Sequence, residues 1–455
     1  MALLTPLAFS LTILLLTLWL LLLRLQLWWH PPIPPLLLLS LLPLTASLHM
    51  SLASSYSPPS LQIALPALFS LYLLLLQLPP SYQPSSSALA YLPTHPSLII
   101  ALIGTILILP VTASLLNLYL LLELTAFSLL ALLRHPTSSE YSLEASLKYY
   151  LLTASSSIAF LLAMILLIGL TGTTLYTSLI LLAYSNLAIS GASPITIGII
   201  LLLTIKLALL PNPLWHTEVY EGVSTTAIYL LALPAKLPYL YLLLNLASLQ
   251  STPLVPAITI VTSIGTMLIL IILIPALYSW RRFLALTGSL HIALILPLVT
   301  ITLPNQAISL YLIAYLILLL PLVQLLSLHH YRHLPKLLPL GYLLPPISLP
   351  VIASWSGMLG LPPSLGFLTK AMVCLIILDS YGTLIGLILL LKAATSLYYS
   401  LSLGSILLSR PTLPLQLTPR IAHVASLWLL PAYFISLTTL CYWTKPAWII
   451  NLLTA

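Results

Sequence analysis

The sequence predicts an all-α integral membrane protein with about fourteen transmembrane helices. Hydrophobic residues make up 60% of its 455 residues and charged residues only 4%, whereas about 25% of a soluble domain is charged. Runs such as 11–23 and 199–210 are continuously apolar, which excludes the roughly 10-residue alternating strands of a membrane barrel. Proline, serine and charged residues divide the chain into segments long enough to cross a bilayer.

The expected segments follow one another along the whole chain. Those of the first part lie near 7–26, 34–50, 61–79, 97–113, 115–133 and 146–170. The others lie near 194–222, 223–247, 254–279, 282–302, 305–328, 338–378, 382–408 and 421–443.

Two of these segments are too long and too interrupted for one straight helix. Segment 194–222 contains the Pro-Asn-Pro string 211–213, and segment 338–378 contains the glycine- and proline-rich stretch 357–366. Proline removes a backbone donor and clashes with the preceding turn. We therefore predict two discontinuous helices, the seventh and the twelfth.

The basic residues near segment ends follow alternate segments, as expected when one side of the membrane carries them. They are Arg24, Arg134, Arg281, Arg282, Arg332, Lys336, Arg410 and Arg420, with Lys445 as an exception. This parity holds only if each discontinuous segment crosses the membrane once. Both termini are then expected on the same side.

Other features exclude several classes of site. The net charge of +8 comes from scattered residues that form no cluster with aromatic side chains, so no nucleic-acid surface is expected. Cys374 and Cys441 lack the spacing of a zinc, iron–sulfur or disulfide site. The chain opens directly into the apolar run 3–23, so we expect no import presequence and synthesis inside the compartment of use.

Three charged residues lie in the middle of apolar runs: Glu123, Lys206 and Lys236. Each would cost about 2.5–3.5 kcal/mol if it faced lipid at the membrane centre. One interpretation is a structural ion pair or a displaced segment boundary. The other is a buried proton relay, because a buried Glu and Lys can exchange charge states when a neighbour changes.

Further candidates have weaker patterns. Lys370 follows the second interruption, where irregular backbone lines a cavity in membrane proteins. It is therefore a site residue or, alternatively, a lysine whose charged end extends to the membrane interface. Glu144 and Lys148 are four residues apart, a spacing that suits a surface pair as well as a site, and this choice stays open.

Four more residues carry little signal of their own. His291 and Lys392 lie inside expected segments, where a lone histidine is more often structural than a proton carrier. Glu218 and Glu221 suit charges at a helix start better than the mouth of a relay.

Several strings, in this order, resemble the antiporter-like subunits of respiratory complex I, most closely the chain 2 type, called subunit N in bacteria. They are LELTAFSLLAL, SLEASLKYYLLTASSS, IKLALLPNPLWHTEVYEGVST, LPAKLPYLYL, RRFLALTGSLH, YLIAYL and LGLPPSLGFLTK. The resemblance runs from roughly residue 100 to 405. The Glu-Ala-x-x-Lys-Tyr string favours chain 2 over the related chains 4 and 5.

The resemblance implies two inverted five-helix repeats with helices 7 and 12 broken, an architecture related to that of transporters. It implies N-terminal helices 1–3 in 1–95, an antiporter-like core in 96–408, and a last helix and tail in 409–455. The implied proton pathway consists of Glu123, Lys206, Lys236, Lys370, Lys148, Glu144 and His291.

The chain departs from the family at one motif. The family usually reads Pro-Phe-His-x-Trp-x-Pro after helix 7, but Asn212 and Pro213 replace the Phe and His here, and Thr217 replaces the second Pro. A relay through that histidine is therefore in doubt. Lys392 has no counterpart in the family pattern.

The resemblance implies a proton-translocating subunit in the membrane arm of an NADH:ubiquinone reductase. It implies no redox cofactor in this chain, with NADH, FMN, iron–sulfur clusters and ubiquinone elsewhere in the complex. The implied partners are membrane-arm subunits of the chain 4 and 4L types, supernumerary subunits and lipids such as cardiolipin. The expected location is the mitochondrial inner membrane, with an organelle-encoded chain and both termini on the intermembrane-space side.

Two alternatives remain at this stage. A subunit of a related cation/proton antiporter would also keep buried Glu and Lys residues. A membrane scaffold would use its buried charges only to fix helix packing.

Overall fold

The computed structural model describes residues 98, 102, 104–106, 109, 112, 114–134, 140–175, 178–179, 192–248, 254–273, 279–301, 305–328, 354–361 and 364–382. The named elements of this part of the chain are all helices, and Ser114 and Leu175 form an isolated bridge. Four of its helices are long and apolar enough to cross a membrane: Leu115–Leu133, Glu140–Thr171, Ala227–Leu246 and Trp280–Thr300. The predicted all-α membrane class is confirmed.

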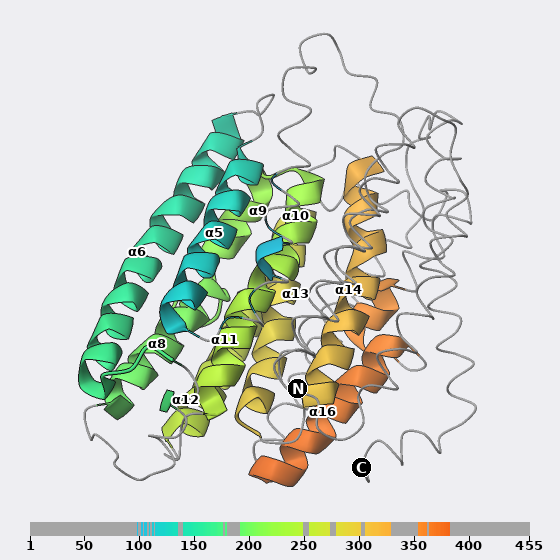
Figure 1. The fold of residues 1–455 in the computed structure, drawn as a ribbon. Coiled ribbons are helices and arrows are strands. Elements are labelled where there is room, and N and C mark those ends of the chain that lie inside the picture. The colour runs from blue at the N-terminus through green and yellow to red at the C-terminus, as the bar shows by residue number, and fades with distance from the viewer. Residues whose placement is uncertain are drawn as a thin grey trace, which may run out of the picture.

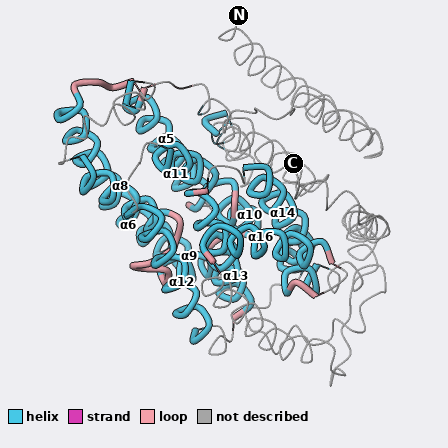
Figure 2. The backbone as a smooth tube through the Cα atoms, turned by 90° about the horizontal axis from the view of Figure 1, so that it is seen from below, coloured by secondary structure: helices cyan, strands magenta, loops and turns pink. Residues whose placement is uncertain are grey.

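The named elements run in the following order along the chain. They are α5 (Leu115–Leu133), α6 (Glu140–Thr171), α8 (Ala192–Lys206), α9 (Trp215–Gly222), α10 (Thr225–Ala232), η3 (Pro234–Lys236), α11 (Leu237–Ser248), α12 (Leu254–Leu273), α13 (Trp280–Ile295), η5 (Leu296–Thr300), α14 (Asn305–Leu328) and α16 (Leu365–Tyr381). Figure 1 shows that the long helices run roughly side by side, with α6 at one edge and α14 and α16 toward the other. The view along the helices in Figure 2 shows α9, α10, α11 and α13 between those edges.

The first predicted interruption separates α8 from α9. Helix α8 ends at Lys206, and the next residues close a Schellman-type turn, in which Leu209 N–H donates to Thr204 O and Ala208 N–H to Ile205 O. Ala208 has a left-handed φ of 60°. The helix therefore ends before the proline pair that predicted its break.

The second predicted interruption lies between helical residues 354–359 and α16. Leu361 N–H donates to Ser356 O and Gly360 N–H to Gly357 O, with a φ of 79° at Gly360. Ser364 then starts α16, because its side chain accepts a hydrogen bond from Phe367 N–H, as a good N-cap does.

A short 3-10 turn inside one predicted segment was not expected. We expected 223–247 to be one segment, and Ala227–Leu246 is one candidate span, but within it α10 ends at Ala232 and η3 precedes α11. Pro234 lies at the start of η3 and has no N–H to continue the preceding helix. Lys236, one of the predicted pathway residues, is the last residue of this tight turn.

Some expectations lie outside the described residues. These include the segments expected within 1–95, the whole stretch from 329 to 353, Lys392, and the chain from 383 onward with its last expected segments. The predicted boundaries at 95/96 and 408/409 lie there as well.

Candidate functional site

A buried ion pair joins α5 to the end of α8. The Lys206 Nζ lies 3.4 Å from Glu123 Oε1, and the two side chains are 3% and 19% exposed. A lysine this deep in a membrane protein needs compensation for its lost hydration. The distance exceeds the 2.7–2.9 Å of a tight charge-assisted hydrogen bond. Glu123 is therefore an ion-pair partner for Lys206, but the contact is longer than a tight hydrogen bond.

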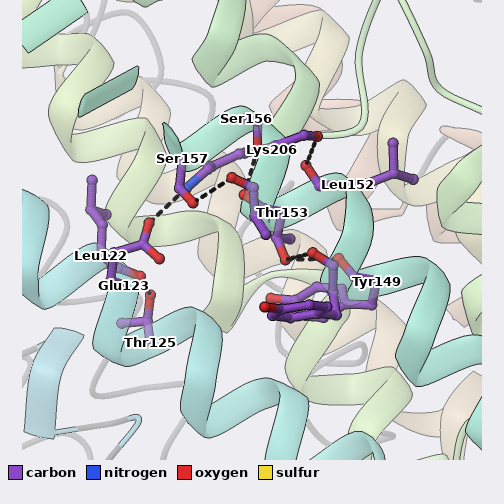
Figure 3. Close-up of polar contacts among 12 residues, drawn as sticks. Leu122, Glu123, Thr125, Tyr149, Leu152, Thr153, Ser156, Ser157 and Lys206 are labelled. Carbon is purple, nitrogen blue, oxygen red and sulfur yellow. Dashed lines mark hydrogen bonds and ion pairs between the residues drawn. The ribbon is translucent and has the colours of Figure 1, made fainter. Parts of the chain in front are cut away.

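Hydroxyl and aromatic side chains surround this pair. Figure 3 shows Lys206 reaching toward Glu123 past the α6 residues Thr153, Ser156 and Ser157. These three hydroxyls donate to α6 carbonyls, so each oxygen can still accept a hydrogen bond. The ring of Tyr239 lies 5.3 Å from Lys206 Nζ, which is close enough for a cation–π contact.

A small cavity links Lys206 to Lys236. Its volume is about 20 Å³, and its lining is Tyr149, Thr153, Lys206, Trp215, His216, Leu231, Ala235, Lys236 and Tyr239. Lys236 is 3% exposed, and its Nζ has no hydrogen-bond partner in the described part of the chain. A cavity of this size holds about one water molecule. Two of the predicted pathway lysines thus line one cavity.

Lys148 forms an ion-pair cluster nearer the surface. Its Nζ lies 2.7 Å from Glu144 Oε1 and 2.7 Å from Glu218 Oε2, and all three side chains are 38–60% exposed. The expected i,i+4 pair is present, and Glu218 lies in the first turn of α9, as expected of a helix-start charge. At this exposure each pair contributes at most about 1 kcal/mol. The cluster ties α6 to α9 beside the first interruption.

Glu221 has a separate partner at the end of α9. Arg282 Nε lies 2.7 Å from Glu221 Oε1, and Arg282 Nη2 donates a hydrogen bond of 2.7 Å to Glu221 Oε2. The neighbouring Arg281 donates to the carbonyls of Glu221 and Val223. These contacts connect α9 to α13.

His291 lies in a buried aromatic cluster on α13. Its Nδ1 is 2.6 Å from the hydroxyl of Tyr311, and its ring centre is 4.7 Å from that of Tyr315, both on α14. The structure thus gives this predicted residue a hydrogen-bond partner.

Lys370 reaches back across the second interruption. From α16, its Nζ donates to the carbonyl of Met358 in the last turn before the break. A Cβ added at Gly360 would meet the lysine Cδ at 3.0 Å. Carbonyls at a helix end lack intrahelical partners and carry partial negative charge. The break therefore supplies the acceptor for this lysine.

Sequence reasoning missed several residues around these lysines. Thr153 with its serine neighbours, Tyr239 and His216 surround Lys206 or its cavity, and Tyr311 binds His291. Only the polar string TASSS inside an apolar helix gave a readable signal. Within the described residues, no group of three or more His, Cys, Asp or Glu side chains could hold a metal ion.

Residues 112–396 match the family described as NADH:quinone oxidoreductase/Mrp antiporter, transmembrane. The chain belongs to this family. It is 27% identical over 312 residues to NADH-quinone oxidoreductase subunit N 2 of Thermodesulfovibrio yellowstonii, an alignment that covers 66% of this chain and 67% of that protein. It is 30% identical over 267 residues to NADH-ubiquinone oxidoreductase chain 2 of Metridium senile, covering 56% and 67%. The predicted resemblance to the chain 2 and subunit N type is confirmed.

Two solved structures share the fold of this chain. A chain of respiratory complex I from Thermus thermophilus has a TM-score of 0.66 at 24% identity and covers 96% of this chain and 98% of its own length. A chain of the Mrp complex from Dietzia sp. also has a TM-score of 0.66, at 20% identity, over 78% of this chain and 67% of its own. The fold thus occurs in both kinds of membrane complex.

Proposed function

We propose that this chain is a proton-translocating subunit in the membrane arm of respiratory complex I. The observation that carries the proposal is the buried Glu123–Lys206 pair at the first helix interruption, with Lys236 sharing the adjacent cavity. Relatives named as complex I subunits support the choice of complex. Quinone reduction elsewhere in the complex would drive the charge movements.

The proposed mechanism begins with Glu123 stabilising the protonated form of Lys206. Movement of the carboxylate away from Lys206 would leave a buried, unpaired ammonium, which is costly. The lysine would then release its proton toward Lys236. From there the proton would pass toward His291 and Lys370, with Lys370 nearest the exit. Lys148 and Glu144 would lie at the surface end of the pathway.

Finer features of the proposal come from the family. They are fourteen helices in two inverted repeats and the domain limits 1–95, 96–408 and 409–455. The chain would bind no redox cofactor itself, while NADH, FMN, iron–sulfur clusters and ubiquinone would act elsewhere in the complex. Its neighbours would be chain 4 and 4L type subunits, supernumerary subunits and cardiolipin, in the mitochondrial inner membrane.

The test replaces Lys206 with methionine, which has a similar length and no charge. Protons pumped per electron would be measured on the assembled complex in vesicles. We expect a clear drop in this ratio with continued electron transfer. An unchanged ratio would refute the relay.

A subunit of a cation/proton antiporter is the second candidate, because the Mrp complex chain shares the fold. The two candidates differ in their neighbours. Purification of the intact assembly with flavin and iron–sulfur subunits is the result that complex I membership requires, and their absence would favour the antiporter.

A further inference from the structure

His216 is buried at the start of α9, directly after the first interruption. It is 1% exposed and lines the cavity of about 20 Å³ together with Lys206 and Lys236. Its ring lies edge-on to that of Trp215 at 5.4 Å and tilted against that of Tyr220 at 4.3 Å. The imidazole is therefore fixed by packing at the space that the two lysines share.

The polar atoms of this imidazole are not used by the protein scaffold. Among the residues that the structure describes, neither Nδ1 nor Nε2 has a hydrogen-bond partner within normal distance and angle, and the nearby backbone of Ala285 interacts with the ring. A buried polar group left unsatisfied costs about 1–3 kcal/mol, so it calls for an explanation. A residue present only for packing would be expected to be apolar here.

The cavity offers what the imidazole lacks. A buried water needs two to four polar partners and a volume above about 10–15 Å³. Lys236 Nζ also lacks a partner, and Lys206 and the Thr153 hydroxyl line the same space. One water at this position can satisfy several of these groups together.

Lys206 and Lys236 also need an intermediate between them. Two ammonium groups cannot approach closely, because like charges in a low-dielectric interior repel strongly. An imidazole solves this problem, since it accepts a proton at one nitrogen and releases one from the other. It is neutral whenever either lysine holds the proton.

We propose that His216 is the proton carrier between Lys206 and Lys236, an inference that rests on the proposed function. Protonated Lys206 gives its proton through the cavity water to neutral His216 and becomes an amine. The imidazolium then gives the proton on its opposite nitrogen to the neutral amine of Lys236. One proton and one positive charge move, and rotation of the ring or a return of tautomer through water resets the carrier.

The test compares His216→Gln with Lys206→Met and with the double variant in the assembled complex. Glutamine keeps a polar side chain but cannot carry a proton as imidazole does. We expect His216→Gln to lower the protons pumped per electron to the value of Lys206→Met, and the double variant to pump no less than either single one. His216→Asn is the second choice if the glutamine variant does not assemble.

Thr217→Val is the matched control. Thr217 is also buried in α9, does not line the cavity, and its hydroxyl bonds only the local carbonyl of Leu214. This variant should keep the wild-type ratio. A full ratio in His216→Gln with a lowered ratio in Lys206→Met would overturn the role of His216 alone. A full ratio in Lys206→Met would overturn both that role and the proposed function.

Discussion

The two helix interruptions end in the same way but hold their lysines differently. Each interruption closes with two backbone hydrogen bonds. In the first, Leu209 N–H donates to Thr204 O and Ala208 N–H to Ile205 O; in the second, Leu361 N–H donates to Ser356 O and Gly360 N–H to Gly357 O. Lys206 is the last helical residue of the first interruption and pairs with a carboxylate. Lys370 comes after the second and donates to a backbone carbonyl.

The difference shows what each lysine can do. A carboxylate can change its charge or move, so the environment of Lys206 can switch. A carbonyl is a permanent dipole fixed by the helix that carries it, so the acceptor of Lys370 stays in place. Under the proposed function, the first interruption would start the proton transfer and the second would hold a proton at a defined position.

Different kinds of residue also stabilise the two interruptions. The second has glycine at its left-handed position and Ser364 as an N-cap, both local signals. The first has Ala208 at the equivalent position and no side-chain cap on α9. Two side chains bridge this break instead: the Thr204 hydroxyl donates to Leu210 O and the Trp215 indole to Ile205 O.

The largest expected effect is that of Gly366→Ala at the second interruption. An added Cβ would lie 1.8 Å from the carbonyl oxygen of Gly357, which is backbone and cannot rotate away. Overpacking usually costs about 1–3 kcal/mol, and this clash should exceed that range. We expect little assembled complex, measured by native gel and activity stain.

Gly169→Ala is its control. A Cβ at Gly169 meets nothing within 4 Å, and alanine favours a helix interior over glycine by about 1 kcal/mol. Normal assembly in this control and loss in Gly366→Ala are expected. Equal assembly in both would contradict the close packing of the second interruption.

A smaller effect is expected from Gly360→Ala. Alanine in the left-handed region costs about 1–2 kcal/mol, and the new Cβ would press on the side chain of Lys370. The thermal stability of the purified complex should fall.

The reverse change at the first interruption, Ala208→Gly, should alter stability by less than about 1 kcal/mol, because relief of strain is offset by the loss of a buried methyl group. A large loss of thermal stability in Ala208→Gly and none in Gly360→Ala would show that positions 208 and 360 are not equivalent left-handed positions.

The smallest effect concerns the N-cap of α16. Ser364→Ala should cost about 1 kcal/mol, and Ser364→Gly only a few tenths, because glycine is itself a tolerated cap. Thermal inactivation of the complex measures both. The opposite order would argue against capping by this serine.

The sequence predicted helices more reliably than contacts. The bounds expected for 115–133 and 305–328 match α5 and α14, because polar residues flank continuous apolar runs there. The first interruption begins before the prolines that predicted it, since backbone hydrogen bonds close the turn at Ala208 and the side chains of Thr204 and Trp215 bridge the break. The turn at Lys236 was missed because a single proline is a weak signal in an apolar run.

The candidate site divides in a similar way. The sequence predicted Glu123, Lys206 and Lys236, because a charged residue inside an apolar run can be recognised from the sequence alone. Their grouping was not visible, since Glu123 and Lys206 are 83 residues apart. His216 was missed because a lone histidine has no pattern, and its value comes from a cavity built by three chain segments.

The most direct test of the account is the proton-to-electron ratio of assembled complex carrying Glu123→Gln. Glutamine retains the shape of the side chain but cannot supply the charge that stabilises protonated Lys206. If this pair starts the transfer, the assembled fraction should transfer electrons while pumping fewer protons per electron. A scaffold role predicts less assembled complex with the full ratio, and that result would contradict the account.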